Sequence, residues 1–127
     1  MNKNLELLFS THGQSAWLDN LQRSYLTSGK LKGLVSEGVR GLTTNPAIFQ
    51  KALQGSDAYD EQFRALIASG SSVEDAYWEM VLADIDAALS VFAELYRNSN
   101  GLDGFVSVEI DPRLAHDSHV TEAAAHA

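Results

Sequence analysis

The chain has 127 residues, 45% of them hydrophobic and 20% charged, a balance typical of one globular domain and not of a disordered segment. Its formal net charge of −8 argues against binding to nucleic acid or to an anionic membrane, because both need a basic surface. The absence of cysteine excludes a disulfide framework and a thiol nucleophile.

The sequence shows no targeting or membrane-spanning segment. The apolar run near the start covers only residues 7–9, which is too short for a secretory signal, and no stretch approaches the roughly 18 apolar residues of a membrane span. We therefore expect a cytoplasmic protein.

The first third of the chain predicts two strands separated by a helix. Residues 14–21 read as a short strand that ends in polar residues, and residues 41–46 read as a second strand that runs into a turn. The helix between them is predicted to end at Gly41, and its apolar positions follow helical spacing: Leu31, Leu34, Val35 and Val39.

Helices then dominate up to residue 98. Pro46 suits the first position of a helix and Asn45 the cap before it, and a further helix is expected within residues 55–70. Ser71 and Glu74 match a capping box that opens a long helix, which is expected to end at residues 98–101. Its apolar stripe is formed by Tyr77, Val81, Ile85, Ala88, Phe92 and Leu95.

Residues 104–111 predict a third strand, in which apolar side chains alternate with a mixed face that carries Glu109. Residues 119–127 predict the beginning of another helix, with Thr121 as its cap. Trp17 and Trp78 are expected in the core, and Arg113 is expected to pair with a nearby side chain.

Strands that alternate with helices predict βαβ units and a parallel α/β sheet. A (β/α)₈ TIM barrel takes about 250 residues, whereas three parallel strands leave the sheet faces and edges incompletely covered. We therefore expect residues 1–127 to be the N-terminal part of a single barrel domain, containing its first three strand–helix units and truncated before the barrel closes.

Polar side chains lie near the carboxyl ends of all three predicted strands: Asp19, Asn45 and Glu109. The carboxyl ends of parallel strands open on one face of a barrel, so these groups are expected to converge on a site for proton transfer. Other roles remain open, because Asp19 can begin the following turn, Asn45 can serve only as a helix cap, and Glu109 can be a solvated carboxylate. The four histidines have no metal-ligand spacing, so we expect no metal site.

Longer motifs point to a family. Four segments of the sequence resemble transaldolases of the longer bacterial kind. They are WLDNLQR (17–23), GLTTNPAIFQKA (41–52), SDAYDEQ (56–62) and FVSVEIDPRLAHD (105–117). The resemblance covers nearly the whole chain, in the same order.

The resemblance implies a (β/α)₈ enzyme of the pentose phosphate pathway that needs no cofactor. Such an enzyme moves a dihydroxyacetone unit from a ketose phosphate to an aldose phosphate through a lysine Schiff base. Asp19 matches the aspartate that handles a sugar hydroxyl proton, and Asn45 matches an asparagine that binds the dihydroxyacetone unit. Glu109 matches a glutamate that transfers protons through a water molecule.

The Schiff-base lysine of that family lies on a fourth strand, which this chain does not contain. The chain's lysines are Lys3, Lys30, Lys32 and Lys51, and none is predicted to end a strand. We therefore expect the chain alone to be inactive. The alternative is a non-catalytic α/β or helical module, and in either case we expect the isolated chain to self-associate through uncovered surface.

Overall fold

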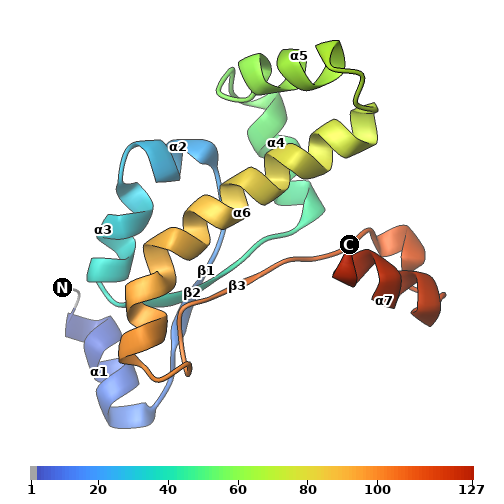
Figure 1. Cartoon of the computed structure of the whole chain (residues 1–127). Helices are drawn as coiled ribbons and strands as arrows, with labels where there is room; N and C mark the ends of the chain where they lie inside the picture. The colour runs from blue at the N-terminus through green and yellow to red at the C-terminus, as the bar shows by residue number, and fades with distance from the viewer. Residues whose placement is uncertain (1–2) are drawn as a thin grey trace.

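A computed structural model describes residues 3–127 and shows a three-stranded parallel sheet with helices packed on it (Figure 1). The strands are β1 (Ala16–Asp19), β2 (Val39–Thr43) and β3 (Phe105–Ser107), and they lie in the order β1-β2-β3. Both neighbouring pairs are parallel, as the alternation of strands and helices predicted. The α/β class and the parallel sheet are therefore confirmed.

The register of the sheet separates a covered face from an open one. Leu42 pairs with Leu18 on one side and with Val106 on the other, and this row packs into the core. On the opposite face Trp17 and Phe105 expose 38% and 42% of their surface. The prediction that Trp17 lies in the core is wrong, because the residue belongs to this open face.

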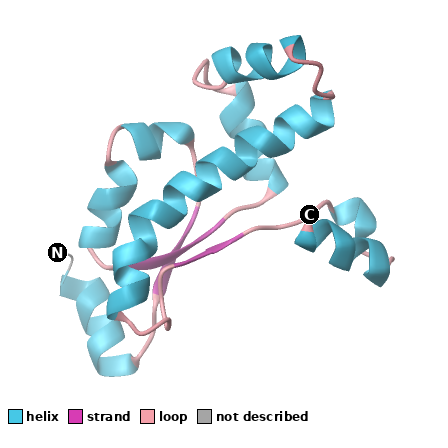
Figure 2. Ribbon diagram, in the orientation of Figure 1, coloured by secondary structure: helices cyan, strands magenta, loops and turns pink. Residues whose placement is uncertain are grey.

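The long helix α6 (Val73–Asn98) covers the sheet together with α2 (Arg23–Thr27) and α3 (Lys30–Ser36). Figure 2 shows the strands running together behind α6. The expected apolar stripe of α6 is confirmed, with its central members buried against the sheet and partly buried residues, Trp78 among them, packed around them. Its buried residues are Ala76, Met80, Val81, Asp84, Ile85, Ala88 and Phe92.

Two helices between β2 and α6 form a smaller packed unit. They are α4 (Pro46–Gln54) and α5 (Asp60–Ala68), and their core includes Ala52, Tyr59 and Met80. An additional helix, α1 (Lys3–His12), precedes β1 and contacts it, although no element was predicted there.

Several element boundaries differ from the prediction because capping and pairing decide them. Ser72, and not Ser71, caps α6: its hydroxyl oxygen accepts a hydrogen bond from the Asp75 backbone N–H at 3.0 Å. Helix α3 ends at Ser36, and Val39 already belongs to β2 because it pairs with Ala16. The strand predicted at 41–46 is therefore shifted towards the N-terminus.

The predicted third strand is too long, since β3 ends at Ser107. Its neighbour β2 ends at Thr43, after which Asn45 caps α4 and Pro46 has no N–H group to donate. Residues 108–111 consequently have no ladder partner on β2 and form an extended arm that leaves the body of the molecule (Figure 1).

The arm carries a short 3₁₀ turn, η1 (Pro112–Leu114), and a last helix, α7 (Ser118–His126). Asp117 caps α7 by accepting a hydrogen bond from the Val120 backbone N–H at 3.0 Å, so the prediction of Thr121 as the cap is wrong. The Thr121 hydroxyl instead donates to the Leu114 carbonyl at 2.8 Å and ties α7 to η1.

Candidate functional site

The carboxyl ends of the three strands form one edge of the sheet, and a row of polar side chains crosses it on the open face. Asp19 pairs with Thr43, and Thr43 pairs in turn with Ser107. The Thr43 hydroxyl donates a hydrogen bond of 2.7 Å to the Asp19 Oδ1 atom. The last residue of β1 is thereby oriented by the strand beside it.

Asn45 follows β2 by two residues and is partly buried at the same edge. Its side-chain oxygen accepts a hydrogen bond of 3.0 Å from the Ile48 backbone N–H, which confirms that Asn45 caps α4. Within residues 3–127 its amide nitrogen makes no hydrogen bond and stays available as a donor. A capping role and contact with a ligand are therefore compatible in this residue.

Glu109 lies two residues beyond β3 and is exposed. The expectation that it projects from a strand is wrong, because the ladder ends at Ser107. No hydrogen bond or ion pair within the described chain joins Glu109 to Asp19 or Asn45.

Threonines at this edge were not singled out from the sequence. Thr44 is only 1% exposed, and its hydroxyl and backbone N–H both donate to the Ser107 carbonyl, at 2.9 and 3.2 Å. Thr43 instead shares the open face with Asp19. The sequence could have distinguished the two threonines of GLTTNPAIFQKA, because successive residues of an extended segment point to opposite faces of the sheet.

All four lysines lie on helices and are exposed, and none ends a strand. Lys3 opens α1, Lys51 lies in α4, and Lys30 and Lys32 lie in α3, where the Lys30 ammonium sits 4.0 Å from the centre of the Tyr25 ring. Among the described residues no cluster of His, Asp or Glu has the geometry of a metal site. No helix between residues 3 and 127 is long and apolar enough to cross a membrane.

The amino ends of the strands are held by a different polar network. Asp103, 2% exposed, accepts hydrogen bonds from the Ser15 hydroxyl at 2.5 Å and from the Arg40 Nε atom at 2.8 Å. Ser15 precedes β1, Arg40 lies in β2, and Asp103 precedes β3, so one carboxylate ties all three strands together. A buried carboxylate therefore holds this end of the sheet, whereas at the other end Asp19 Oδ2 and the Asn45 amide nitrogen make no hydrogen bond within residues 3–127.

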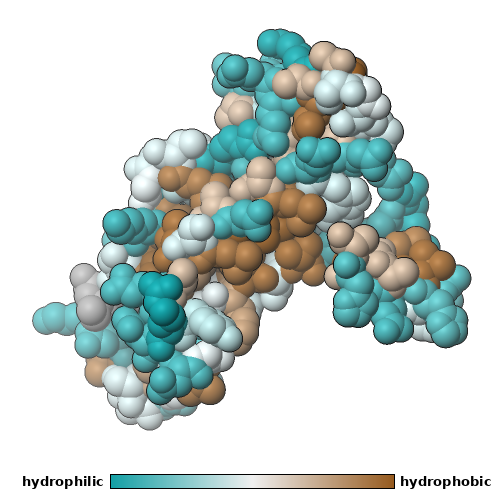
Figure 3. Space-filling view, viewed as in Figure 1, coloured by the Kyte–Doolittle hydropathy of each residue, from teal (hydrophilic) through white to brown (hydrophobic). Residues whose placement is uncertain are grey.

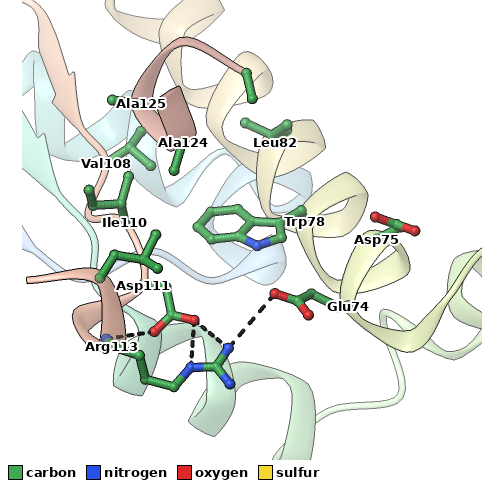
Figure 4. Close-up of a pocket in the computed structure, with 12 residues that line it drawn as sticks. Glu74, Asp75, Trp78, Leu82, Val108, Ile110, Asp111, Arg113, Ala124 and Ala125 are labelled. Carbon is green, nitrogen blue, oxygen red and sulfur yellow. Dashed lines mark hydrogen bonds and ion pairs between the residues drawn. The ribbon is translucent and has the colours of Figure 1, made fainter. Parts of the chain in front are cut away.

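A cleft of about 760 Å³ lies elsewhere, between α6 and the C-terminal arm, with the Trp78 ring at its centre (Figure 4). The Arg113 guanidinium bonds to Asp111 and reaches Glu74 at 3.8 Å, which confirms its predicted local pairing. Hydrogen bonds from Arg113 hold the pKa of Asp111 below its usual range. The cleft shares no lining residue with the row formed by Asp19, Thr43 and Ser107, so it is not the candidate site.

Comparisons with known proteins point to one family. The Transaldolase/Fructose-6-phosphate aldolase family matches residues 16–127. The chain is 50% identical over 125 residues, 98% of its length, to a transaldolase of Saccharopolyspora erythraea. It is 42% identical over 122 residues, 95% of its length, to transaldolase 2 of Nostoc punctiforme. It covers 33% and 32% of these two relatives, and so spans about a third of the length of the curated relatives it matches. The match begins at the first residue of β1 and takes in the whole sheet and the polar row, so the chain belongs to the Transaldolase/Fructose-6-phosphate aldolase family.

Proposed function

We propose that the chain provides the first three strand–helix units of a TIM-barrel transaldolase. The whole enzyme transfers a dihydroxyacetone unit from a ketose phosphate to an aldose phosphate through a lysine Schiff base, within the pentose phosphate pathway and in the cytoplasm. The observation that carries this proposal is the polar row from Asp19 through Thr43, at the carboxyl end of a parallel sheet and on its open face. Barrel enzymes place their chemistry at that end.

Asp19 is proposed to accept the proton of the sugar hydroxyl when the carbon–carbon bond next to the Schiff base breaks. Its carboxylate lies at the edge of the open face and is already oriented by Thr43. A general base must reach the hydroxyl directly or through one water molecule, and the exposed side chain of Asp19 is accessible to a ligand.

Asn45 is proposed to donate a hydrogen bond from its free amide nitrogen to the bound three-carbon unit. Since its oxygen is held by the first turn of α4, the amide cannot rotate freely and its nitrogen has a defined direction. Glu109 is proposed to transfer protons through a water molecule while the Schiff base forms. Asp19 ends β1 and Glu109 lies two residues beyond β3, so the two carboxylates occupy separate places and suit separate tasks.

The alternative of a non-catalytic module that self-associates is less well supported. It would explain the exposed Trp17 and Phe105 on the open face, but the family match favours the enzyme. The same open face is also expected of a barrel interior.

A chimera tests the proposal. Residues 1–127 would replace the matching segment of the 50% identical transaldolase, and turnover would be measured separately from borohydride trapping of the Schiff base. The chimera should turn over, whereas the 127-residue chain alone should form no trapped adduct because its lysines lie on exposed helix surfaces. An adduct on any of these lysines, with turnover, would overturn the assignment.

Substitutions then separate the roles. Asp19→Ala should slow turnover and leave trapping intact, and Glu109→Ala should slow trapping itself. Asn45→Ala should lower the rate roughly tenfold to a few hundredfold, because it removes a hydrogen bond to the substrate. Glu79→Ala, at an exposed position of α6, is the control and should behave like the parent chimera. Parent-like behaviour of all three site variants would reject the site.

A further inference from the structure

Thr43 and Asp19 end two neighbouring strands and are paired in register. The Thr43 hydroxyl donates its single proton to Asp19 Oδ1 at 2.7 Å, an ordinary length for an O–H···O hydrogen bond. Within the described residues the other carboxylate oxygen, Oδ2, has no hydrogen bond. The two oxygens of Asp19 are therefore distinguished before any substrate binds.

We propose that Thr43 is a positioning residue that holds Asp19 Oδ1 and so presents Oδ2 as the atom that accepts the substrate's hydroxyl proton. This inference rests on the proposed function, and it adds a residue that does not itself touch the substrate. Rotation about the last bond of an aspartate side chain is broad and roughly two-fold, so a carboxylate without such a donor exchanges its oxygens readily.

The residue type at position 43 suits this task. Threonine is branched at Cβ, which restricts its first side-chain torsion and fixes the direction of the hydroxyl. Its backbone belongs to the central strand, which is paired on both sides, with Asp19 on β1 and with Ser107 on β3. The donor is thus the best anchored part of the polar row, and the acceptor at the edge strand depends on it.

The neighbouring Thr44 shows what a structural threonine looks like in the same strand end. It is buried, and its hydroxyl donates to the backbone carbonyl of Ser107. The Thr43 bond is exposed to solvent and joins two side chains, so it contributes little to folding. Loss of the Thr44 hydroxyl is expected to lower the melting temperature, whereas loss of the Thr43 hydroxyl is expected to affect turnover.

The test uses the chimera of residues 1–127 and the 50% identical relative. Thr43→Val keeps the shape and removes the hydroxyl, so kcat should fall about tenfold, with KM for the ketose phosphate and Schiff-base trapping unchanged. Thr43→Ser restores the hydroxyl without the branched Cβ and should recover most of the lost rate. In an Asp19→Ala background, Thr43→Val should have no further effect, because the group it positions is gone.

The outcomes separate this inference from the proposed function. If Asp19→Ala is slow while Thr43→Val turns over like the parent, the positioning role is wrong and the function stands. If Asp19→Ala turns over normally, the assignment of Asp19 and this inference both fail. If the chimera is inactive, the side-chain NMR couplings of Asp19 are measured in the 127-residue chain. Thr43→Val should increase the rotamer averaging of the Asp19 side chain. Unchanged couplings would refute the contact between the two residues.

Discussion

The Arg23 guanidinium donates through Nε to Oδ1 of Asp84 at 2.8 Å, and the other oxygen of Asp84 accepts the Tyr59 hydroxyl at 2.7 Å. Asp84 is 2% exposed in the middle of α6, and Arg23 begins α2, four residues after Asp19. The Tyr59 oxygen also accepts the Arg23 backbone N–H at 3.0 Å. This network fixes the start of α2 against α6 and the α4–α5 turn.

Asp84→Ala should destabilise the fold by about 3–5 kcal/mol, because it leaves a largely buried guanidinium without its partner carboxylate. The measurement is the urea unfolding midpoint of the 127-residue chain at one fixed protein concentration. Asp86→Ala is the matched control, since Asp86 lies on the exposed side of the same helix, and it should change stability by no more than about 0.5 kcal/mol. Equal midpoints for the two variants would show that the network is not stabilising.

Stability should fall at alkaline pH because of Tyr59. Burial, with the hydrogen bond to Asp84 as a second cause, raises the pKa of Tyr59 above its ordinary value of 10.0. The unfolded chain therefore loses this proton first, so the free energy of unfolding is unaffected below about pH 10. Above that pH it falls by up to about 1.4 kcal/mol per pH unit until the folded-state pKa is reached.

Tyr59→Phe isolates this effect, because phenylalanine has no proton to lose. Burial also raises the pKa of Tyr77, so the single variant should flatten the alkaline decline in part and Tyr59→Phe with Tyr77→Phe should flatten it further. Chemical unfolding at a series of pH values between 8 and 11 measures the slopes. A Tyr59→Phe chain that declines as steeply as the parent would contradict the assignment.

Gly41→Ala should disturb the open face. A Cβ atom at Gly41 would lie 2.3 Å from the Trp17 ring, so the indole must move away from the sheet. We expect a loss of about 1–3 kcal/mol of stability and a shift in Trp17 fluorescence, measured in a Trp78→Phe background.

Gly33→Ala is the control for that substitution. Its Cβ would meet nothing within 4 Å, and the residue lies within helix α3. The change should therefore stabilise the chain by about 0.5–1 kcal/mol and leave the fluorescence of Trp17 unchanged. Identical effects of the two glycine substitutions would mean that the ring does not rest on Gly41.

The isolated chain should self-associate through its open face and free strand edges. Hydrophobic residues also gather in a band over α6 on the face seen in Figure 3. Phe105→Lys places a charge on the edge strand β3 and should reduce the average mass measured by light scattering. Leu102→Lys, at a residue 80% exposed in the loop before that strand, should leave the mass unchanged. A parent chain that stays monomeric at high concentration would contradict the prediction.

Local patterns were sufficient where the physical cause is local. The apolar stripe of α6 predicted its buried face, since a helix returns the same side to the core every 3.6 residues. The pair Asn45-Pro46 predicted the start of α4, because a side-chain acceptor and a fixed φ favour the first helical turn wherever they occur. Family membership likewise followed from contiguous motifs.

Pairing between distant segments decided the rest. β3 stops at Ser107 because β2 has no further partner to offer, and this excluded Glu109 from the strand that its alternation predicted. The hydrogen bond from Thr43 to Asp19 depends on a register that no single segment specifies. The sequence by itself thus determined the order of the strands and of the helices from α4 to α6, and the family, through helix periodicity and motif order, but it missed α1 and the caps of α6 and α7. Only the tertiary structure decided which polar groups meet, because that depends on strand register and on contacts between residues far apart in the chain.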